Sequence, residues 1–180
     1  MINKAIFLDR DGTIIKDKHY AFLPESIEFL PGVIDGLRRL HDAGFLLIII
    51  TNQSGIARGY FTENNLKVFN ETLLSQLANQ GVFIDAVYYC PHYINGSIKK
   101  YAIECSCRKP QTGLFYIASA DYNIDFSLSY AIGDSDRDCS ICNETQCCGC
   151  VIDGDNIKKD KFKHFENFLQ CVDFILSKDI

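Results

Sequence analysis

The sequence has no tryptophan, a single methionine and only four prolines among its 180 residues. It also lacks a long apolar stretch, because the longest uninterrupted run covers residues 44–50 and a membrane-spanning helix needs ~20. Charged Asp9, Arg10 and Asp11 follow the start so closely that we expect no signal peptide. Basic residues are scarce, with 18 Lys and Arg against 23 Asp and Glu, so we expect neither nucleic acid nor a membrane as a partner. The composition does not exclude a local basic site.

The composition is that of a folded protein. Hydrophobic residues make up 47% of the chain and charged residues 23%, which excludes wholesale disorder. A chain of this length buries roughly 70% of its unfolded surface, so it needs no disulfide framework. The nine cysteines are an odd number and cannot all pair within one chain. We therefore predict a single domain over residues 1–180, a reducing cytoplasmic location and a monomer.

Short apolar runs alternate with longer amphipathic stretches along the chain. Five runs read as buried strands, at residues 5–8, 45–50, 86–89, 129–132 and 150–152. Four stretches read as helices, at residues 33–41, 63–79, 113–122 and 136–145, with Thr62 as the N-cap of the second. Strands buried on both faces and joined by helices predict a three-layer α/β sandwich with a mainly parallel sheet. Sites in such folds lie beyond the carboxyl ends of the strands.

Two carboxylates, Asp9 and Asp11, directly follow the first predicted strand, and Gly12 then allows a sharp turn. A calcium-binding EF-hand loop also begins with alternating acids. That interpretation fails because a strand precedes the pair and the remaining loop ligands are absent. The pair therefore lies where chemistry is expected.

Three further polar segments follow in the order of the chain. The second predicted strand ends in a hydroxyl and amide cluster suited to phosphate oxygens, formed by Thr51, Asn52, Gln53 and Ser54. The basic pair Arg108 and Lys109 precedes a predicted helix. Residues 133–138 follow the fourth predicted strand and contain Asp134, Asp136 and Asp138.

These four segments resemble the four signature motifs of the haloacid dehalogenase (HAD) superfamily of phosphatases. The resemblance implies that Asp9 is the nucleophile that forms an aspartyl-phosphate, and that Asp11 is the general acid and then the general base. It implies that Asp9, the backbone carbonyl of Asp11, and Asp134 hold Mg²⁺, a hard ion that prefers oxygen. Thr51 and Lys109 would stabilise charge on the transferring phosphoryl group.

The roles of the neighbouring acids are less determined. By the same resemblance, Asp138 would orient Lys109 or the waters on the metal. Asp136 has two interpretations, a direct catalytic role or a favourable charge at the start of the following helix, and we favour the second. Thr51 as a turn cap and Lys109 as a solvated lysine are the alternatives to their phosphate roles.

A cysteine and histidine pattern lies between the second and third motifs. Cys90 and His92 are followed, after twelve intervening residues, by Cys105 and Cys107. Three thiols and one imidazole suit a closed tetrahedral zinc site at residues 90–107, and four protein ligands make its role architectural. The alternative is a set of free surface thiols. For the remaining cysteines, including the group from Cys139 to Cys150, we predict core packing.

A zinc loop before the third motif resembles the D,D-heptose 1,7-bisphosphate phosphatase family, which is related to histidinol-phosphate phosphatases. The resemblance is greatest at residues 7–14, 51–59 and 105–110. It implies substrate contacts from Asp17, Lys18, His19, Tyr20, Asn52, Gln53, Ser54 and Arg108. The gap between Thr13 and the first predicted helix is too short for a folded cap domain, so we expect an open site.

The leading expectation is a Mg²⁺-dependent phosphatase that removes the C7 phosphate of a heptose 1,7-bisphosphate. By resemblance, it would serve nucleotide-heptose synthesis for lipopolysaccharide or capsule. Histidinol-phosphate phosphatase is the enzymatic alternative, since the catalytic and zinc motifs are shared. A zinc-dependent binding module with a decayed phosphatase core is the alternative of another class.

Overall fold

The structure, a computed structural model, describes residues 2–152 and 161–178. Its strands form one sheet in the order β3-β2-β1-β4-β5-β6, and every neighbouring pair is parallel. The strands are β1 (Ala5–Leu8), β2 (Leu46–Asn52), β3 (Ala86–Cys90), β4 (Tyr130–Gly133), β5 (Cys148–Ile152) and β6 (Lys163–Phe165). The predicted α/β class with a mainly parallel sheet is confirmed.

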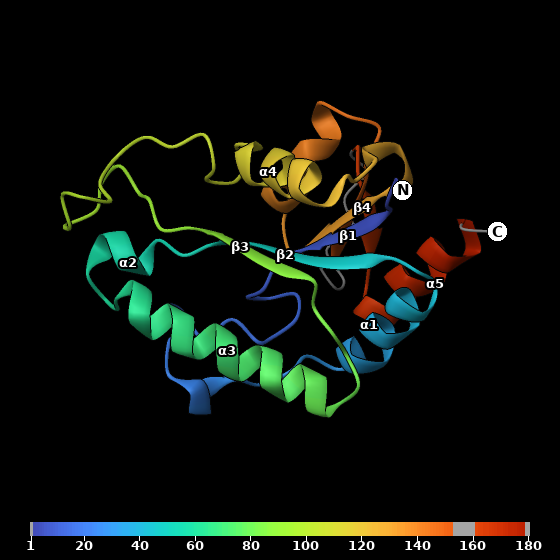
Figure 1. The fold of residues 1–180 in the computed structure, drawn as a ribbon, viewed down its shortest axis with the longest axis horizontal. Helices are drawn as coiled ribbons and strands as arrows, with labels where there is room; N and C mark the ends of the chain where they lie inside the picture. The colour runs from blue at the N-terminus through green and yellow to red at the C-terminus, as the bar shows by residue number, and fades with distance from the viewer. Residues whose placement is uncertain (1, 153–160, 179–180) are drawn as a thin grey trace.

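The helices cover both faces of this sheet (Figure 1). The α-helices are α1 (Val33–Asp42), α2 (Gly55–Arg58), α3 (Glu63–Asn79), α4 (Gly113–Tyr122) and α5 (Phe168–Lys178). Three short 3₁₀ helices are η1 (Pro24–Ser26), η2 (Phe126–Leu128) and η3 (Asp136–Asn143). In Figure 1, α4 lies on one side of the strands, while α1, α3 and α5 lie on the other.

The alternation of side chains along β1 explains the two layers. Ile6 and Leu8 belong to the hydrophobic cluster shared with α1, α3 and α5, whereas Ala5 and Phe7 belong to the cluster shared with α4 and η3. All four residues are buried, because successive strand residues point to opposite faces and both faces are covered. Phe7 meets Phe115 of α4 edge to face, with ring centroids 5.3 Å apart.

Register places three strand ends side by side. Within the sheet, Phe7 of β1 is paired with Ile48 of β2 on one side and with Ala131 of β4 on the other. The carboxyl ends of β1, β2 and β4 therefore meet at one edge. The first, second and fourth predicted motifs follow these three ends.

Several predicted helices are confirmed closely, and Thr62 caps α3 as predicted. The Thr62 hydroxyl accepts a hydrogen bond from the Asn65 backbone N–H, and the Asn65 side chain accepts one from the Thr62 N–H. The prediction at 136–145 is wrong in type, because the segment is a 3₁₀ helix with a kink at Cys139. Continuous 3₁₀ runs longer than about four residues are uncommon, and the kink at Cys139 divides this segment into two shorter pieces.

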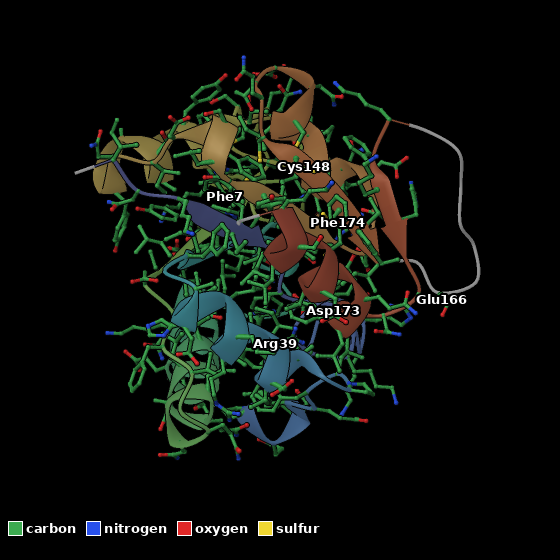
Figure 2. All side chains as sticks on the ribbon, turned by 90° about the vertical axis from the view of Figure 1, so that its right-hand side faces the viewer. Phe7, Arg39, Cys148, Glu166, Asp173 and Phe174 are labelled. Carbon is green, nitrogen blue, oxygen red and sulfur yellow. The ribbon has the colours of Figure 1, made fainter. Side chains whose placement is uncertain are left out.

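Two elements near the C-terminal end were not predicted, β6 and α5. Helix α5 packs against α1, and Arg39 Nη2 lies 2.6 Å from Asp173 Oδ1 across that contact (Figure 2). Gly36 of α1 allows the close approach, since a Cβ there would lie 2.7 Å from the Phe168 ring. This helix pair completes the layer beneath β1 and β4.

The described residues contain no cap domain, as predicted. Between β1 and α1 the chain forms only η1, and between β2 and β3 it forms α2 and α3. None of the helices in the described part of the chain has the length and apolar character needed to cross a membrane.

Candidate active site

The first site segment leaves β1 at Asp9 and turns at Gly12. Gly12 has a φ of +88°, and a Cβ on it would lie 2.2 Å from Oδ2 of Asp134. Glycine is required there both by conformation and by space. The parallel pairing of β1 with β4 places Asp9 and Asp134 at neighbouring strand ends, and the turn at Gly12 passes against Asp134.

Lys109 is buried at the centre of the site. Its Nζ lies 2.7 Å from Asp9 Oδ1, 2.7 Å from Asp138 Oδ1 and 2.6 Å from the carbonyl oxygen of Ile50. Burial alone would lower the pKa of Lys109, but the two carboxylates raise it above its ordinary value. Two of the three donors of the ammonium group are hydrogen-bonded, to Asp9 and to the Ile50 carbonyl, while Asp138 lies at ion-pair distance.

Asn52 holds the backbone of Lys109 from the end of β2. Its Nδ2 donates to the Lys109 carbonyl oxygen at 3.0 Å, and its Oδ1 accepts from the Lys109 N–H at 3.0 Å. The predicted phosphate-binding amide is thus engaged with protein. Thr51 is buried beside it and accepts a hydrogen bond from Gln53 Nε2 at 3.0 Å.

Three carboxylates, Asp9, Asp134 and Asp138, gather around Lys109. One oxygen of each lies within 4.8 Å of the others. Burial raises the pKa of Asp9 to about 7, an effect that Lys109 opposes and that Asp138 and Asp11 reinforce. Burial and Asp138 raise the pKa of Asp134 to about 6. Lys109 holds the pKa of Asp138 below its ordinary value despite burial.

This cluster fits a divalent cation. Three acids against one lysine leave an excess of negative charge in a buried place, and a bound cation would offset it. The buried Oδ1 of Asp134 accepts no hydrogen bond from any described residue, and the nearest cation is Arg137 at 3.8 Å. Carboxylate oxygens are the ligands that Mg²⁺ prefers.

The carboxylate of Asp11 is held by hydrogen bonds from Arg10 and Gln53. Arg10 Nε and Nη2 donate to Asp11 Oδ2 and Oδ1 at 3.0 and 3.1 Å. Gln53 Nε2 donates to Asp11 Oδ2 at 2.9 Å. The Asp11 side chain remains partly exposed, so it faces the opening of the site.

A cavity of about 230 Å³ opens at this edge of the sheet. Its lining includes the predicted residues Asp9, Asp11, Asp17, His19, Tyr20, Thr51, Asn52, Gln53, Ser54, Arg108 and Lys109. Lys18 is not part of the lining, and its Nζ lies 2.9 Å from Glu28 Oε2 instead. The lining also includes Arg10, Ala21, Arg137 and Asp138.

The segment after β1 forms one wall of the cavity in an uncommon conformation. His19 and Tyr20 both have positive φ, at 52° and 66°, and Asp17 Oδ1 accepts a hydrogen bond from the His19 N–H at 2.8 Å. The Tyr20 ring packs edge to face on Tyr60, with centroids 4.9 Å apart. Arg58 lies over the Tyr20 ring at 5.6 Å.

A second wall comes from the loop between β3 and α4, which projects beyond α2 in Figure 1 and supplies Arg108 and Lys109 to the lining. The ligand atoms of Cys90, His92 and Cys105 lie within 4.8 Å of one another. Cys107 is outside this group of three, although its N–H donates to the Cys105 sulfur at 3.3 Å. Burial raises the pKa of Cys90 to about 12, so a nearby cation is needed to favour its thiolate.

The other ambiguous residues have simple positions. Asp136 is exposed in the first turn of η3 and does not line the cavity. All nine cysteines are free thiols. Most of those from 139 onward are buried in the hydrophobic clusters, in line with the predicted core packing: Cys139, Cys142, Cys147, Cys150 and Cys171.

Comparison with known proteins identifies the family. A family model described as polynucleotide kinase 3 phosphatase matches residues 4–167, so the chain belongs to the family that this model describes. The D-glycero-beta-D-manno-heptose-1,7-bisphosphate 7-phosphatase of Yersinia pestis is 45% identical over 134 residues, covering 74% of this chain and 71% of that protein. The chain belongs to the heptose 1,7-bisphosphate phosphatase family of HAD-like phosphatases.

Solved structures of this fold agree with that assignment. A protein described as a HAD-like phosphatase, from Mesorhizobium loti, superposes with a TM-score of 0.89 at 30% identity, over 99% of this chain and 86% of that one. The D,D-heptose 1,7-bisphosphate phosphatase from B. bronchiseptica, complexed with magnesium and phosphate, gives 0.81 at 27% identity, over 97% of this chain and 99% of that one. The predicted resemblance to both HAD phosphatases and the heptose bisphosphatase family is confirmed.

Sequence reasoning missed two arginines of the heptose bisphosphatase site. Arg10 is buried between the two predicted acids, and Arg137 lines the cavity from η3. Alternation gives no signal for Arg10, because a residue between two site acids is expected to point away from both, whereas the Arg10 guanidinium contacts Asp11. No sequence signal marks Arg137, which follows Asp136 in a polar run.

Proposed function

We propose that the protein is a Mg²⁺-dependent phosphatase that removes the C7 phosphate from D-glycero-D-manno-heptose 1,7-bisphosphate. The observation that carries this proposal is the cluster of Asp9, Asp134 and Asp138, two of which pair with the buried Lys109, beside a cavity lined by Asp9, Lys109 and Asp138. The identity of 45% with a heptose bisphosphate phosphatase supports the substrate.

Magnesium would be held by Asp9, Asp134 and the backbone carbonyl of Asp11. The unpartnered Oδ1 of Asp134 and the excess of buried acid support this assignment. When bound, the ion neutralises charge on the phosphoryl oxygens and fixes their orientation. Magnesium together with phosphate in the related B. bronchiseptica enzyme supports the same choice of metal.

Asp9 and Asp11 divide the reaction into two steps. An oxygen of Asp9 attacks phosphorus, the bond from phosphorus to the sugar oxygen breaks, and Asp11 gives its proton to that departing oxygen. Water then attacks the aspartyl-phosphate, its proton passes to Asp11, and the Asp9 carboxylate is regenerated as inorganic phosphate leaves. Atoms and protons balance over the cycle, which consumes one water.

Thr51, Ser54 and Lys109 would stabilise the transferring phosphoryl group. Thr51 and Ser54 offer hydroxyls at the cavity wall. Lys109 acts mainly as a fixed positive charge, because its ammonium group is hydrogen-bonded to Asp9 and the Ile50 carbonyl and ion-paired with Asp138. Such preorganised charge is where most catalysis of phosphoryl transfer resides.

Substrate selection would come from the two walls of the cavity. Asp17, His19 and Tyr20 come from the segment after β1, Arg108 comes from the loop between β3 and α4, and Gln53 follows β2. With no cap domain in the described residues, the far end of a phosphorylated sugar can stay solvated. A contact from Lys18 is less favoured, since its ammonium pairs with Glu28 outside the lining.

Zinc would order the second wall, with Cys90, His92, Cys105 and Cys107 as ligands. Arg108 Nη1 donates to the His92 carbonyl oxygen at 3.3 Å, which ties the basic pair to the cysteine and histidine cluster. A cation that gathers the three close ligands, and draws in Cys107, would fix Arg108 at the cavity. The metal's role would be architectural, because four protein ligands close its shell.

A substrate panel tests the proposal. Phosphate release is measured with Mg²⁺ for the heptose bisphosphate, histidinol phosphate and a 3′-phosphorylated oligonucleotide. We expect kcat/KM for the heptose bisphosphate to exceed the others by about 100-fold or more, a difference of roughly 2.7 kcal/mol in transition-state binding. A higher kcat/KM for histidinol phosphate or for the oligonucleotide would overturn the proposed substrate. No turnover of any of the three compounds would indicate a binding module.

We also propose, as part of this function, a monomeric protein of the cytoplasm that serves nucleotide-heptose synthesis. Nine free thiols are consistent with a reducing compartment. The single-domain organisation over residues 1–180 stays a prediction, since residues 1, 153–160 and 179–180 lie outside the described part.

A further inference from the structure

Arg10 is the largest fully buried side chain in the described structure, with 1% of its surface exposed. A guanidinium group cannot shed its charge, and an unpaired charge in the interior is costly. A buried arginine therefore needs strong partners, and a buried ion pair is by itself weak evidence of a stabilising role, since replacing the whole pair by apolar residues is often neutral for stability. Its presence at this position suggests a role in the chemistry beside it.

The principal partner of Arg10 is the next residue, Asp11. Nε and Nη2 engage both oxygens of the carboxylate, at 3.0 and 3.1 Å, and Nη2 also lies 2.8 Å from Oδ2. A two-point contact of this kind fixes the plane of a carboxylate as well as its position. A lysine, with one point of charge, cannot do so.

The two oxygens of Asp11 differ in their surroundings. Oδ2 accepts hydrogen bonds from both Arg10 and Gln53, whereas Oδ1 accepts from Arg10 alone among the described residues. Oδ1 therefore keeps more capacity to take up and give away a proton. Since Asp11 lines the cavity, this oxygen is placed to exchange a proton with a group bound there.

Helix α3 holds the guanidinium from behind. Asn70 Oδ1 accepts a hydrogen bond from Arg10 Nη1 at 2.9 Å, and the Phe69 ring lies 4.5 Å from the guanidinium carbon. The flat ring and the fork of hydrogen bonds together leave one orientation for Arg10. The sequence of contacts runs from α3 through Arg10 to Asp11.

We propose that Arg10 is a positioning residue that fixes the carboxyl plane of Asp11, so that Oδ1 carries the proton exchanged with the leaving oxygen. The inference rests on the proposed function, in which Asp11 is the general acid. It predicts a selective defect. A sugar alcohol is a basic leaving group that needs a proton as it departs, whereas p-nitrophenolate leaves without one.

The test compares kcat/KM for the heptose bisphosphate and for p-nitrophenyl phosphate, in wild type and in Arg10→Lys. For each substrate, kcat/KM reports only the steps up to the first irreversible one, which is the departure of the alcohol or phenol. It therefore isolates the step in which Asp11 acts as the general acid. We expect Arg10→Lys to lose about 10- to 100-fold on the heptose bisphosphate and less than about threefold on p-nitrophenyl phosphate. Arg39→Lys, which alters only the exposed pair with Asp173, is the matched control.

Equal losses on both substrates would overturn the inference, because a merely structural role would move both alike. If Arg10→Lys fails to fold by circular dichroism, Asn70→Ala decides, since it removes a contact of Arg10 at a half-exposed helix position. We then expect a selective loss of about threefold or more on the heptose bisphosphate, and no loss or an equal loss overturns the inference. Failure of the proposed function is distinguishable from failure of this inference, because the former is observed as a wild-type protein without activity or as an active Asp9→Asn variant.

Discussion

The side-chain amide of Asn52 is hydrogen-bonded in both directions to the backbone of Lys109, at 3.0 Å each way. The two residues are 57 positions apart in the chain. This pairing joins the end of β2 to the segment that follows the cysteine and histidine loop. It fixes the backbone from which the Lys109 ammonium reaches Asp9 and Asp138.

Replacing Asn52 by alanine removes both hydrogen bonds and leaves two backbone groups of Lys109 without partners. We expect the free energy of unfolding to fall by about 1–3 kcal/mol, the usual effect of unsatisfied buried polar groups. We also expect kcat to fall by about 10-fold or more with little change in KM, because the Lys109 ammonium is displaced while the cavity walls that bind the substrate remain in place. Steady-state kinetics and urea unfolding measure these effects. Asn64→Ala, on the exposed surface of α3, is the control.

The nucleophile assignment is tested by Asp9→Asn. The amide has nearly the same shape but cannot attack phosphorus, so we expect phosphate release to fall by at least about 1,000-fold while circular dichroism shows a folded protein. Asp136→Asn, at an exposed position in η3, removes the same charge without touching the cavity and is expected to keep near wild-type turnover. Substantial turnover by Asp9→Asn would rule out Asp9 as the nucleophile.

Stability of the metal-free protein should depend on the two acids whose pKa values are raised. An unfolded aspartate has a pKa near 3.8, whereas Asp9 and Asp134 in the fold keep their protons until about 7 and about 6. Between those values the folded state binds more protons, so its stability decreases as pH rises from about 4 to about 7. Above about 7 this contribution is constant.

Differential melting of wild type and Asp134→Asn, both in EDTA, isolates this effect from other titrating groups. We expect the variant to gain melting temperature relative to wild type as pH rises from 4 to about 6, because it lacks one of the disfavoured charges. Adding Mg²⁺ should stabilise wild type more at pH 8 than at pH 5.5, since metal and protons compete for the same oxygens. Parallel melting curves for both proteins across this range would contradict the pKa assignment for Asp134.

The architectural role of zinc is tested by Cys107→Ser. We expect elemental analysis to find one zinc per chain in wild type and none in the variant. We also expect kcat/KM to fall by about 10-fold, because Arg108 loses its fixed position beside the cavity. Cys148→Ser, outside the cluster, is expected to keep both zinc and activity. A zinc-free Cys107→Ser protein with unchanged kcat/KM would refute the link between zinc and the basic pair.

Much of the fold could be predicted because the strands are buried on both faces and therefore read as continuous apolar runs. The ends of α1, α3 and α4 were also predicted to within a residue, and Thr62 marks the start of α3. Strand β6 was not, because its residues Lys163–Phe165 are only partly buried and carry no alternation. Helix α5 was missed although Phe168, Cys171, Val172 and Ile175 have helical spacing.

The site could be predicted in outline for a topological reason. Parallel strands bring their carboxyl ends together, so motifs that follow β1, β2 and β4 must meet, whatever their separation in the chain. The partners of individual side chains could not be predicted in this way. Sequence alone does not show that Asn52 binds the backbone of Lys109, or that Lys18 turns to Glu28, because such pairs depend on the path of the loops.

The catalytic groups lie at the strand ends, whereas the cavity walls come from loops, and this separation has a consequence for how such enzymes diversify. The reactive carboxylates and the turn at Gly12 follow strand ends of the sheet, and Lys109 is held to the end of β2 by Asn52. The two flanking walls, around Tyr20 and around Arg108, carry none of the bond-breaking groups. Exchanging those walls between relatives should therefore redirect the enzyme to a new phosphorylated metabolite while the reaction itself is inherited unchanged.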